Sequence, residues 1–223
     1  MSEDLSASCV IFTEQAATNG KKIGFATLNA EKSLNALTLD MIRRLDARLR
    51  QWADDDSIAC VVLQGAGEKA FCAGGDVRKL REAIVAHPKG SPTPFAADYF
   101  AEEYRLDYRI HTYDKPILLW GSGLGLMAGA SHRIVTETSR IAMPEITIGL
   151  YPDVGGSWFL PRMPGRVGLF LALTGAPLNA HDARVVNLAD WFVKSDDKLA
   201  IFAGLVTVPW AENPADNHGK LAK

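Results

Sequence analysis

The run Ile-Ala-Cys-Val-Val-Leu-Gln at 58–64 constrains the fold more than any other part of the chain. A strand-length run without polar alternation is typical of a parallel strand that is buried on both faces and covered by helices. Gly65-Ala66-Gly67 follows this run, and Asp76 then begins a predicted helix with Val77, Leu80 and Ile84 facing inward. Strand, glycine-rich turn and helix in this order predict an α/β fold with a parallel sheet.

The remaining chain alternates between strand-like and helix-like patterns. Asn19-Gly20 separates two apolar runs and indicates a β-hairpin near the start of the chain. Thr38 is a predicted N-cap, and the apolar residues after it recur at helical spacing as far as Asp54. Strands are predicted at 9–12, 23–28, 117–120, 133–136 and 191–193, with a further short one at 141–143, and helices at 96–112, 167–173, 181–186 and 199–206.

Composition limits the classes to which this protein can belong. Apolar residues make up 48% and charged residues 22% of the 223 residues, as in an ordinary globular domain with one core. The net charge of -2 argues against a nucleic-acid-binding surface, which usually carries a basic stripe. No apolar segment approaches the ~20 residues of a membrane span, and the acidic N-terminus shows no secretory signal. The three cysteines lack metal-like spacing, which predicts free thiols and a cytoplasmic location.

The segment Phe-Cys-Ala-Gly-Gly-Asp at 71–76 lies between the buried strand and a helix start. A glycine-rich turn in this place leaves backbone N–H groups pointing at one spot, where the helix dipole also favours negative charge. Such a spot can hold a phosphate or an oxyanion, and Ala73, Gly74 and Gly75 are the candidate residues. The alternative is a plain strand-to-helix turn whose glycines only permit tight packing, and the residues alone leave it open.

Two acidic residues, Glu145 and Asp153, lie eight positions apart in an apolar stretch that also contains Pro144, Pro152 and Gly155-Gly156. A carboxyl group in apolar surroundings has a raised pKa and can act as an acid or base near neutral pH. The alternative is structural: Glu145 pairs or caps, and Asp153 begins a turn. The presence of two acids within one such stretch favours the chemical interpretation.

Other chemistries lack their motifs in this chain. Gly121-Ser-Gly-Leu-Gly125 follows a predicted strand, but the third glycine of a dinucleotide-binding motif would fall at Leu126. No nucleophile elbow of the G-x-S-x-G type occurs, and the five histidines show no metal-ligand spacing. An oxyanion site at 73–75 that works with Glu145 and Asp153 suits reactions of an activated acyl group.

The motifs at 71–76, 142–156, 159–162 and 171–175 closely resemble the enoyl-CoA hydratase/isomerase (crotonase) superfamily, and within it the branch that hydrolyses 3-hydroxyisobutyryl-CoA. The resemblance covers roughly residues 8–210. It implies one α/β domain with the crotonase fold of repeated ββα units, followed at 211–223 by a polar tail that begins an incomplete C-terminal helical region. It also implies a coenzyme A thioester as substrate, no metal or redox cofactor, no nucleic-acid or membrane partner, and compatibility with a homo-oligomer.

The resemblance implies a role for each matching residue. The backbone N–H of Ala73, with Gly74 and Gly75 around it, would form one side of the oxyanion hole. Glu145 would be the principal catalytic carboxylate, which either attacks the thioester to give a mixed anhydride or acts as the base for water. Asp153 would orient the substrate 3-hydroxyl group or help to move protons.

Further residues are assigned to the substrate by the same resemblance. Glu103, in Glu-Glu-Tyr, matches an acid of the substrate pocket, and Asp76 ends a motif that lines the substrate site. The basic residues Lys69, Arg78 and Lys79 are placed where the phosphates of coenzyme A could pass, although a solvated helix face explains them equally well.

Two features depart from the family pattern. Gly125 occupies the place where hydratases of the superfamily carry a further glutamate, which disfavours water addition by two glutamates. The segment after 117–120 is about six residues shorter than in the family, so the glycine that supplies the second oxyanion N–H has no counterpart after Gly123. Either the deletion is real, or a loop is missing from the sequence as written; we expect the second, because every flanking motif is intact.

The leading expectation is therefore a thioesterase for a short branched 3-hydroxyacyl-CoA, as in valine breakdown. The alternative within the enzymes is an enoyl-CoA hydratase or isomerase that uses Glu145 alone. A third alternative, from a different class, is a catalytically impaired protein that only binds acyl-CoA.

Overall fold

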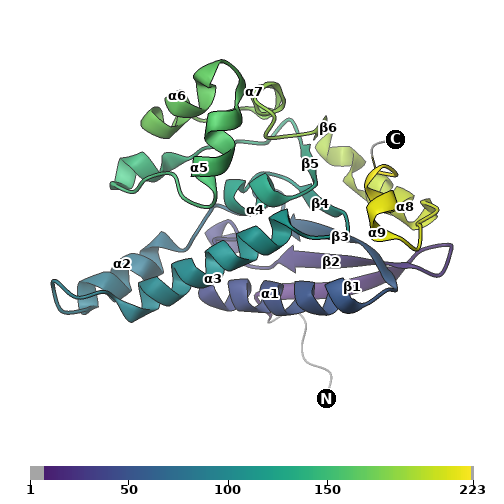
Figure 1. Cartoon of the computed structure of the whole chain (residues 1–223), viewed down its shortest axis with the longest axis horizontal. Helices are drawn as coiled ribbons and strands as arrows, with labels where there is room; N and C mark the ends of the chain where they lie inside the picture. The colour runs from purple at the N-terminus through teal and green to yellow at the C-terminus, as the bar shows by residue number, and fades with distance from the viewer. Residues whose placement is uncertain (1–7, 222–223) are drawn as a thin grey trace.

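The computed structural model describes residues 8–221 and is built around one six-stranded sheet (Figure 1). The strand order in the sheet is the order in the chain, β1 to β6. β1 pairs with β2 in antiparallel orientation, and every later neighbour is parallel. The strands are β1 Val10–Ala16, β2 Lys22–Leu28, β3 Ile58–Gly65, β4 Ile117–Trp120, β5 His132–Val135 and β6 Trp191–Phe192.

Helices connect the parallel strands, as the alternating pattern predicts. They are α1 Leu39–Asp54, α2 Val77–Ala86, α3 Pro94–His111, α4 Leu124–Gly129, α5 Gly156–Phe159, α6 Val167–Thr174, α7 Ala180–Val185, α8 Lys198–Thr207 and α9 Pro214–His218. Short 3₁₀ turns lie between them: η2 Glu31–Ser33, η3 Pro144–Ile148, η4 Leu160–Arg162, η5 Pro164–Arg166 and η6 Ser195–Asp197. No helix within residues 8–221 is long and apolar enough to cross a membrane.

Local sequence signals explain several of these boundaries. Gly20 adopts a φ of +85° in the turn of the first hairpin, a conformation that glycine reaches without steric cost. The Thr38 side chain accepts a hydrogen bond from Met41 N, as expected of an N-cap at the start of α1. Asp76 caps α2 in the same way through Lys79 N.

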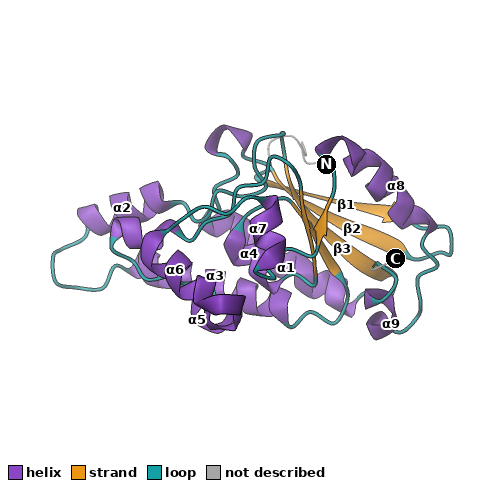
Figure 2. Ribbon diagram, turned by 90° about the horizontal axis from the view of Figure 1, so that it is seen from above, coloured by secondary structure: helices purple, strands orange, loops and turns teal. Residues whose placement is uncertain are grey.

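The sheet separates two apolar clusters. The larger cluster packs α1 and α3 against one face through residues such as Trp52, Leu106 and Leu119. The smaller one packs Phe202 of α8 and Trp210 against the other face. In Figure 2 most helices lie to the left of the strands, whereas α8 and α9 lie to the right. The strand β3 is buried on both sides, as its apolar run predicts.

Three local expectations differ from the structure. In α2 only Leu80 is buried, whereas Val77 and Ile84 are about half exposed, because this helix projects at one end of the molecule and packs along only one side (Figure 1). Residues 141–143 make only an isolated bridge from Ile141 to Leu178 rather than a strand.

The third difference concerns the polar tail, for which the sequence shows no capping or docking face. Residues 214–218 form α9, which Asn213 caps through Ala215 N. Asn217 is 1% exposed and exchanges hydrogen bonds with the backbone of Ala211. His132 Nε2 lies 3.0 Å from His218 O, so this segment is tied to β5 by polar contacts that no apolar pattern announces.

Candidate active site

The candidate site lies where the carboxyl ends of β3 and β4 lead into the segments that follow them. In open parallel sheets this edge is the usual place for ligands. The site is formed by the glycine loop at 71–76, by the face of α3 that carries Tyr99, Glu103 and Asp107, and by the segment from η3 to Asp153. These segments are far apart in the chain. They meet because β3 and β4 are neighbouring parallel strands and α3 belongs to the connection between them.

The glycine loop has two backbone N–H groups that are free to act as donors. Among the described residues, none accepts a hydrogen bond from the N–H of Gly74 or Gly75. The N–H of Ala73 instead donates to Leu34 O at 3.0 Å. The role of Ala73 in the oxyanion hole stays a prediction, and in this structure its N–H has a partner within the protein.

Leu37 holds this loop in place. Leu37 N donates to Gly74 O at 2.8 Å, and Leu37 O accepts from Asp76 N at 3.0 Å. The Tyr99 hydroxyl also donates to Leu37 O, at 2.7 Å. A Cβ at Gly75 would lie 2.7 Å from the Tyr99 oxygen, so the close approach of α3 to the loop requires glycine there.

The short connection from β4 to α4 packs directly against the same loop. A Cβ at Gly123 would lie 2.8 Å from the Phe71 ring and 2.9 Å from Cys72 Cβ. Gly125 faces Val154, whose Cγ1 would be 3.2 Å from an added Cβ. The place where the family's hydratases carry a second glutamate therefore offers no carboxylate and little room for one.

Cys72 lies under the loop and has a structural environment. Its thiol is buried and lies 3.7 Å from Gly74 O. Burial raises the pKa of this thiol to about 12, so thiolate is scarce at neutral pH. This agrees with the interpretation of Cys72 as a filler of a small buried site.

Glu145 has a partly desolvated carboxyl group. It lies in η3, and its Oε2 atom is buried without a hydrogen-bond partner among the described residues. Burial raises the pKa of this carboxyl group, and the nearby charge of Asp153 raises it further. A desolvated, unpartnered carboxylate oxygen is available for nucleophilic attack or proton abstraction.

Asp153 is held by a side chain that the sequence analysis does not identify. Tyr104 of α3 donates a hydrogen bond from its hydroxyl group to Asp153 Oδ2 at 2.7 Å. Asp153 O also accepts from Gly156 N at 2.6 Å, which ties the residue to the start of α5. Asp153 is thus fixed from two directions next to Glu145.

Glu103 and Asp107 add two more acids to the site. Glu103 is 6% exposed, and burial, together with the charges of Asp107 and Asp153, raises its pKa to about 8. Burial also raises the pKa of Asp107, to about 7. The predicted substrate residue Glu103 therefore lies in the cluster, whereas Asp107 is new. Its signal in the sequence is a second acid one helical turn after Glu103.

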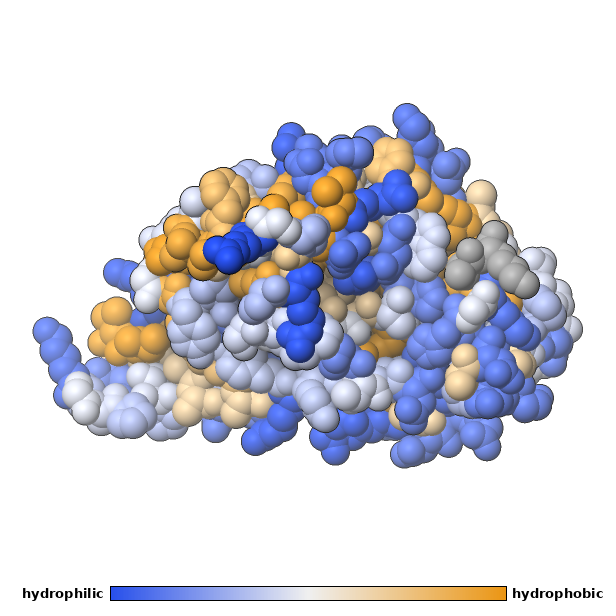
Figure 3. All heavy atoms as spheres, turned by 45° about the horizontal axis from the view of Figure 1, so that its top comes forward, coloured by the Kyte–Doolittle hydropathy of each residue, from blue (hydrophilic) through white to orange (hydrophobic). Residues whose placement is uncertain are grey.

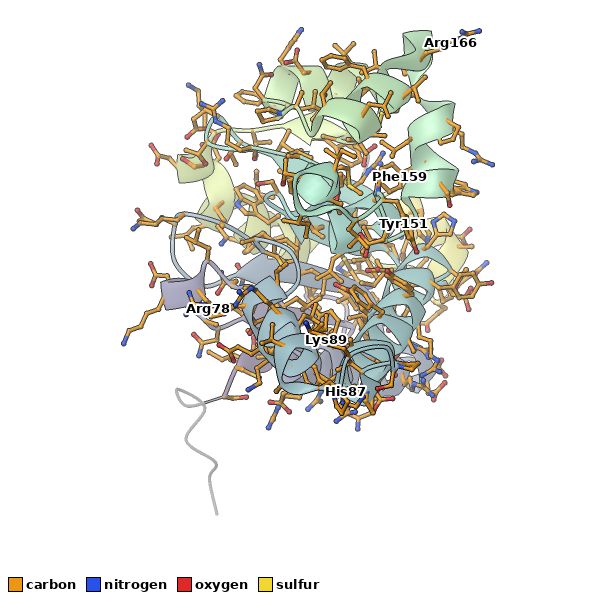
Figure 4. The ribbon with its side chains drawn as sticks, turned by 90° about the vertical axis from the view of Figure 1, so that its left-hand side faces the viewer. Arg78, His87, Lys89, Tyr151, Phe159 and Arg166 are labelled. Atoms are coloured by element: carbon orange, nitrogen blue, oxygen red, sulfur yellow. The ribbon has the colours of Figure 1, made fainter. Side chains whose placement is uncertain are left out.

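The other residues assigned to the substrate have structural surroundings of their own. The Asp76 carboxylate caps α2 through Lys79 N, and its role in substrate binding stays a prediction. Lys69 precedes the loop, and Lys79 is exposed 3.9 Å from Glu82. Figure 4 shows Arg78, with His87 and Lys89, in the lower layer of the molecule, away from Tyr151 and Phe159 in the upper layer. Within residues 8–221, no three His, Cys, Asp or Glu side chains are placed to hold a metal ion.

Apolar side chains flank the site on its outer side. An orange patch at the upper left of Figure 3 lies over α6. The exposed residues that form this surface and its continuation in η3 and α5 are Leu169, Phe170, Leu173, Ile146, Ile148 and Trp158. Ile146 and Ile148 of this surface lie in η3, the turn that also carries Glu145.

Comparison with known proteins identifies the family of the chain. The chain matches the family model described as enoyl-CoA hydratase/isomerase over residues 23–222. A curated protein of Danio rerio named 3-hydroxyisobutyryl-CoA hydrolase, mitochondrial, is 47% identical over 181 residues, which are 78% of this chain and 46% of that protein. The Homo sapiens protein of the same name is 44% identical over 184 residues, 80% of this chain and 46% of its own length. The chain thus spans about half the length of the curated relatives it matches.

Solved structures share the architecture. A carnitinyl-CoA dehydratase from Mycobacterium thermoresistibile superposes with a TM-score of 0.80 at 36% identity, covering 95% of this chain and 59% of that one. An enoyl-CoA hydratase from Rhodobacter sphaeroides 2.4.1 gives a TM-score of 0.79 at 40% identity, with 89% and 58% covered. The crotonase-like α/β fold expected from the motifs is confirmed.

One expectation is corrected by the same comparison. The curated relatives are mitochondrial proteins by name, so the prediction of a cytoplasmic location is wrong. That prediction rested on free cysteines, and the described residues do contain free thiols at Cys9, Cys60 and Cys72. Free thiols indicate a reducing environment but do not identify the compartment.

Proposed function

Because this chain belongs to the enoyl-CoA hydratase/isomerase family, we propose that it hydrolyses the thioester of a short branched 3-hydroxyacyl-coenzyme A. The substrate to test first is 3-hydroxyisobutyryl-CoA, a compound of valine breakdown, because the curated relatives are named for its hydrolysis. The observation that carries the proposal is the buried, unpartnered Oε2 of Glu145 beside Asp153.

The reaction starts at the thioester carbonyl carbon. In the first route Glu145 attacks this carbon, the carbonyl oxygen becomes an oxyanion, and the C–S bond breaks to release coenzyme A as a thiolate that takes up a proton. Water then cleaves the mixed anhydride to the 3-hydroxy acid and restores Glu145. In the second route Glu145 takes a proton from water as the water oxygen attacks the same carbon. The C–S bond of the tetrahedral intermediate then breaks, and the coenzyme A thiolate takes up the proton from Glu145.

The oxyanion is stabilised by the N–H groups of Gly74 and Gly75, which have no partners within the described chain. Donors of this kind lower the barrier because they are already oriented where negative charge develops. Asp153, fixed by Tyr104, orients the 3-hydroxyl group or moves protons. Glu103 contributes to the substrate pocket from α3.

The short β4–α4 connection determines the rate of hydrolysis that we expect. Loss of one oxyanion donor costs on the order of a hundred-fold in rate. If the six-residue difference is real, hydrolysis is slow; an intact mass that matches 24.2 kDa establishes the sequence as written. A larger mass would show that the sequence as written lacks residues, and peptide mass mapping across residues 117–129 would show whether they lie in this connection.

The test is release of free thiol from 3-hydroxyisobutyryl-CoA by the wild type, by Glu145→Gln and by Glu137→Gln. Glu137 is a matched control, since it follows β5 and accepts hydrogen bonds from Ser195, outside the site. We expect Glu145→Gln to lower kcat by at least about 10²-fold and Glu137→Gln to retain wild-type activity. Equal rates for all three proteins would contradict the role of Glu145.

The same three proteins also distinguish hydrolysis from the alternative functions. Hydration or isomerisation of an enoyl-CoA without thiol release would favour a hydratase or isomerase that uses Glu145 alone; Gly125 disfavours only water addition by two glutamates. Acyl-CoA binding without any turnover would favour a protein that only binds its ligand. A transient mass increase equal to the acyl group, absent in Glu145→Gln, would select the anhydride route.

A further inference from the structure

Leu37 bonds to the glycine loop on both sides of its two free donors. The N–H of Leu37 donates to Gly74 O at 2.8 Å, and Leu37 O accepts from Asp76 N at 3.0 Å. Between these two bonds lie the N–H groups of Gly74 and Gly75, which have no acceptor among the described residues. The position of Leu37 therefore decides how the loop presents these donors.

The peptide unit between Gly74 and Gly75 shows how this control works. The carbonyl group of Gly74 and the N–H of Gly75 belong to one planar unit, and in a trans peptide they point in opposite directions. No peptide bond within residues 8–221 is cis. Because Gly74 O points at Leu37 N, the N–H of Gly75 points away from Leu37. Any rotation of this unit about the contact with Leu37 turns the Gly75 donor with it.

Tyr99 of α3 fixes Leu37 through a side-chain hydrogen bond. The hydroxyl group of Tyr99 donates to Leu37 O at 2.7 Å, and the residue is 1% exposed. Its ring packs edge-on against Phe100, with ring centroids 5.6 Å apart, so the hydroxyl group comes from a well-packed part of the helix. The same oxygen fills the space beside Gly75, where an added Cβ would lie 2.7 Å from it. One hydroxyl group thus meets both Leu37 and the residue that carries the donor.

The direction of the bond from Tyr99 to Leu37 does not change near neutral pH. Burial raises the pKa of Tyr99 above its ordinary value, so the hydroxyl group keeps its hydrogen. A backbone carbonyl oxygen can only accept. Tyr99 is therefore the donor throughout this range, and its effect on the loop should not depend on pH.

Asn35 anchors the segment that carries Leu37. Asn35 is 1% exposed and has a φ of +56°, a left-handed conformation that asparagine adopts more readily than most residues. Its Nδ2 donates to Ala66 O at 3.0 Å and to Ala70 O at 2.9 Å. Its Oδ1 accepts from Ala30 N at 2.9 Å. The segment is thus held independently of α3, so loss of the hydroxyl contact alone should leave it folded.

We propose that Tyr99 is a positioning residue: its hydroxyl group holds Leu37 and so aims the Gly75 N–H at the oxyanion of the reaction. This inference rests on the hydrolase function proposed above. Without the hydroxyl group, Leu37 O loses a donor and the space beside Gly75 is left empty. The peptide unit then gains freedom to turn. A donor that is oriented in advance stabilises the transition state more than the bound substrate, so the loss should appear in kcat rather than in KM.

The kinetic test compares Tyr99→Phe with Tyr113→Phe in thiol release from 3-hydroxyisobutyryl-CoA. Tyr113 is the matched control, because its hydroxyl group also donates to a backbone carbonyl, Leu49 O, at 2.7 Å, but outside the site. Both substitutions keep the ring and remove one such bond, so similar losses in the free energy of unfolding are expected.

We expect Tyr99→Phe to lower kcat about 10-fold or more at every pH from about 6 to 8, with KM changed by less than about two-fold. Tyr113→Phe should retain the wild-type kcat. Equal kcat values for the two variants would overturn the proposal, whether both fall or neither does. A rise in KM at unchanged kcat in Tyr99→Phe would overturn it as well.

A second measurement follows the loop without turnover. Amide ¹⁵N relaxation gives the order parameter of the Gly75 N–H, and hydrogen exchange reports on the bond from Asp76 N to Leu37 O. We expect a lower order parameter at Gly75 and faster exchange at Asp76 in Tyr99→Phe, and wild-type values in Tyr113→Phe. Wild-type values at both amides in Tyr99→Phe would contradict the proposal.

The two measurements fail separately. A wild-type protein that releases no thiol contradicts the hydrolase function, but the Gly75 and Asp76 amides still decide whether the Tyr99 hydroxyl group holds the loop. An active wild type whose kcat survives Tyr99→Phe keeps the hydrolase function and removes the role of Tyr99.

Discussion

At the scale of single residues, the site depends on carboxyl groups that are buried to different degrees. Glu145 and Asp153 are identifiable from the sequence because their apolar, proline- and glycine-punctuated surroundings are visible there. Tyr104 is not, because its importance arises from the contact of α3 with a segment about fifty residues away. The hydrogen bond from the Ala73 N–H to Leu34 O is likewise invisible in the sequence, because it forms only in the folded chain.

Tyr104→Phe tests the support of Asp153. The substitution removes a 2.7 Å hydrogen bond to a carboxylate, and bonds to charged groups contribute about 1.5–3 kcal/mol. We expect kcat for thiol release to fall about 10-fold or more, and the free energy of unfolding to fall by no more than this bond contributes. Tyr108→Phe, on an exposed position one turn later, serves as the control, and similar rates for both variants would show that the bond to Asp153 is dispensable.

Glu103→Gln tests the raised pKa through protein stability. The native state holds the Glu103 proton up to a pKa of about 8, whereas the unfolded chain releases it near 4.5. Wild-type stability should therefore fall as pH rises through this window, by up to about 1.4 kcal/mol per pH unit. Chemical denaturation of Glu103→Gln should show a shallower fall, with the variant more stable than wild type at pH 8. Parallel curves would show that Glu103 is not protonated in the native state.

At the scale of secondary-structure elements, features that depend on local residues are predictable from the sequence. Features that depend on how an element packs against others are not. The hairpin, α1, β3 and the N-cap of α2 follow their sequence signals closely. The apolar pattern of α2 does not indicate which side is buried, because the helix has protein on one side only. The docking of α9 relies on polar contacts of Asn217 and His218, which resemble ordinary surface residues in the sequence.

Gly168→Ala tests the close packing of α6 on η4. An added Cβ at Gly168 would overlap the carbonyl group of Leu160, so the helix or the turn has to move. We expect a loss of about 1–3 kcal/mol in the free energy of unfolding, as for other overpacked sites. Gly204→Ala in α8 is the opposite case, because nothing lies within 4 Å of its Cβ, and it should stabilise the protein by about 0.5–1 kcal/mol. Equal effects of the two substitutions would contradict the packing shown here.

At the scale of the whole molecule, the two faces of the sheet are covered unequally. The face that carries the site is packed by several helices, whereas the other face relies on α8 and on the segment around Trp210. Trp210 is 4% exposed and donates from its indole N–H to Leu205 O at 3.0 Å. Trp210 therefore belongs to the smaller apolar cluster, which covers the second face of the sheet with few other large side chains.

Trp210→Ala should lower the free energy of unfolding by about 3–5 kcal/mol, the range for large buried aromatic residues. Trp158→Ala is the matched comparison, because Trp158 is 49% exposed, and a smaller loss is expected. Both values can be read from urea denaturation. A loss at Trp210 no greater than that at Trp158 would mean that the second face does not need this side chain.

The agreement between strand order and chain order has a consequence for how the protein is made. Each strand from β2 onward adds to the free edge left by the strand before it, so none has to be inserted between two already paired neighbours. A chain emerging from the ribosome can therefore extend its sheet by one strand at a time, in the order in which the strands are synthesised. The final edge strand, Trp191–Phe192, is only two residues long. So short an edge gives a neighbouring nascent chain little backbone on which to pair, which limits aggregation while translation continues.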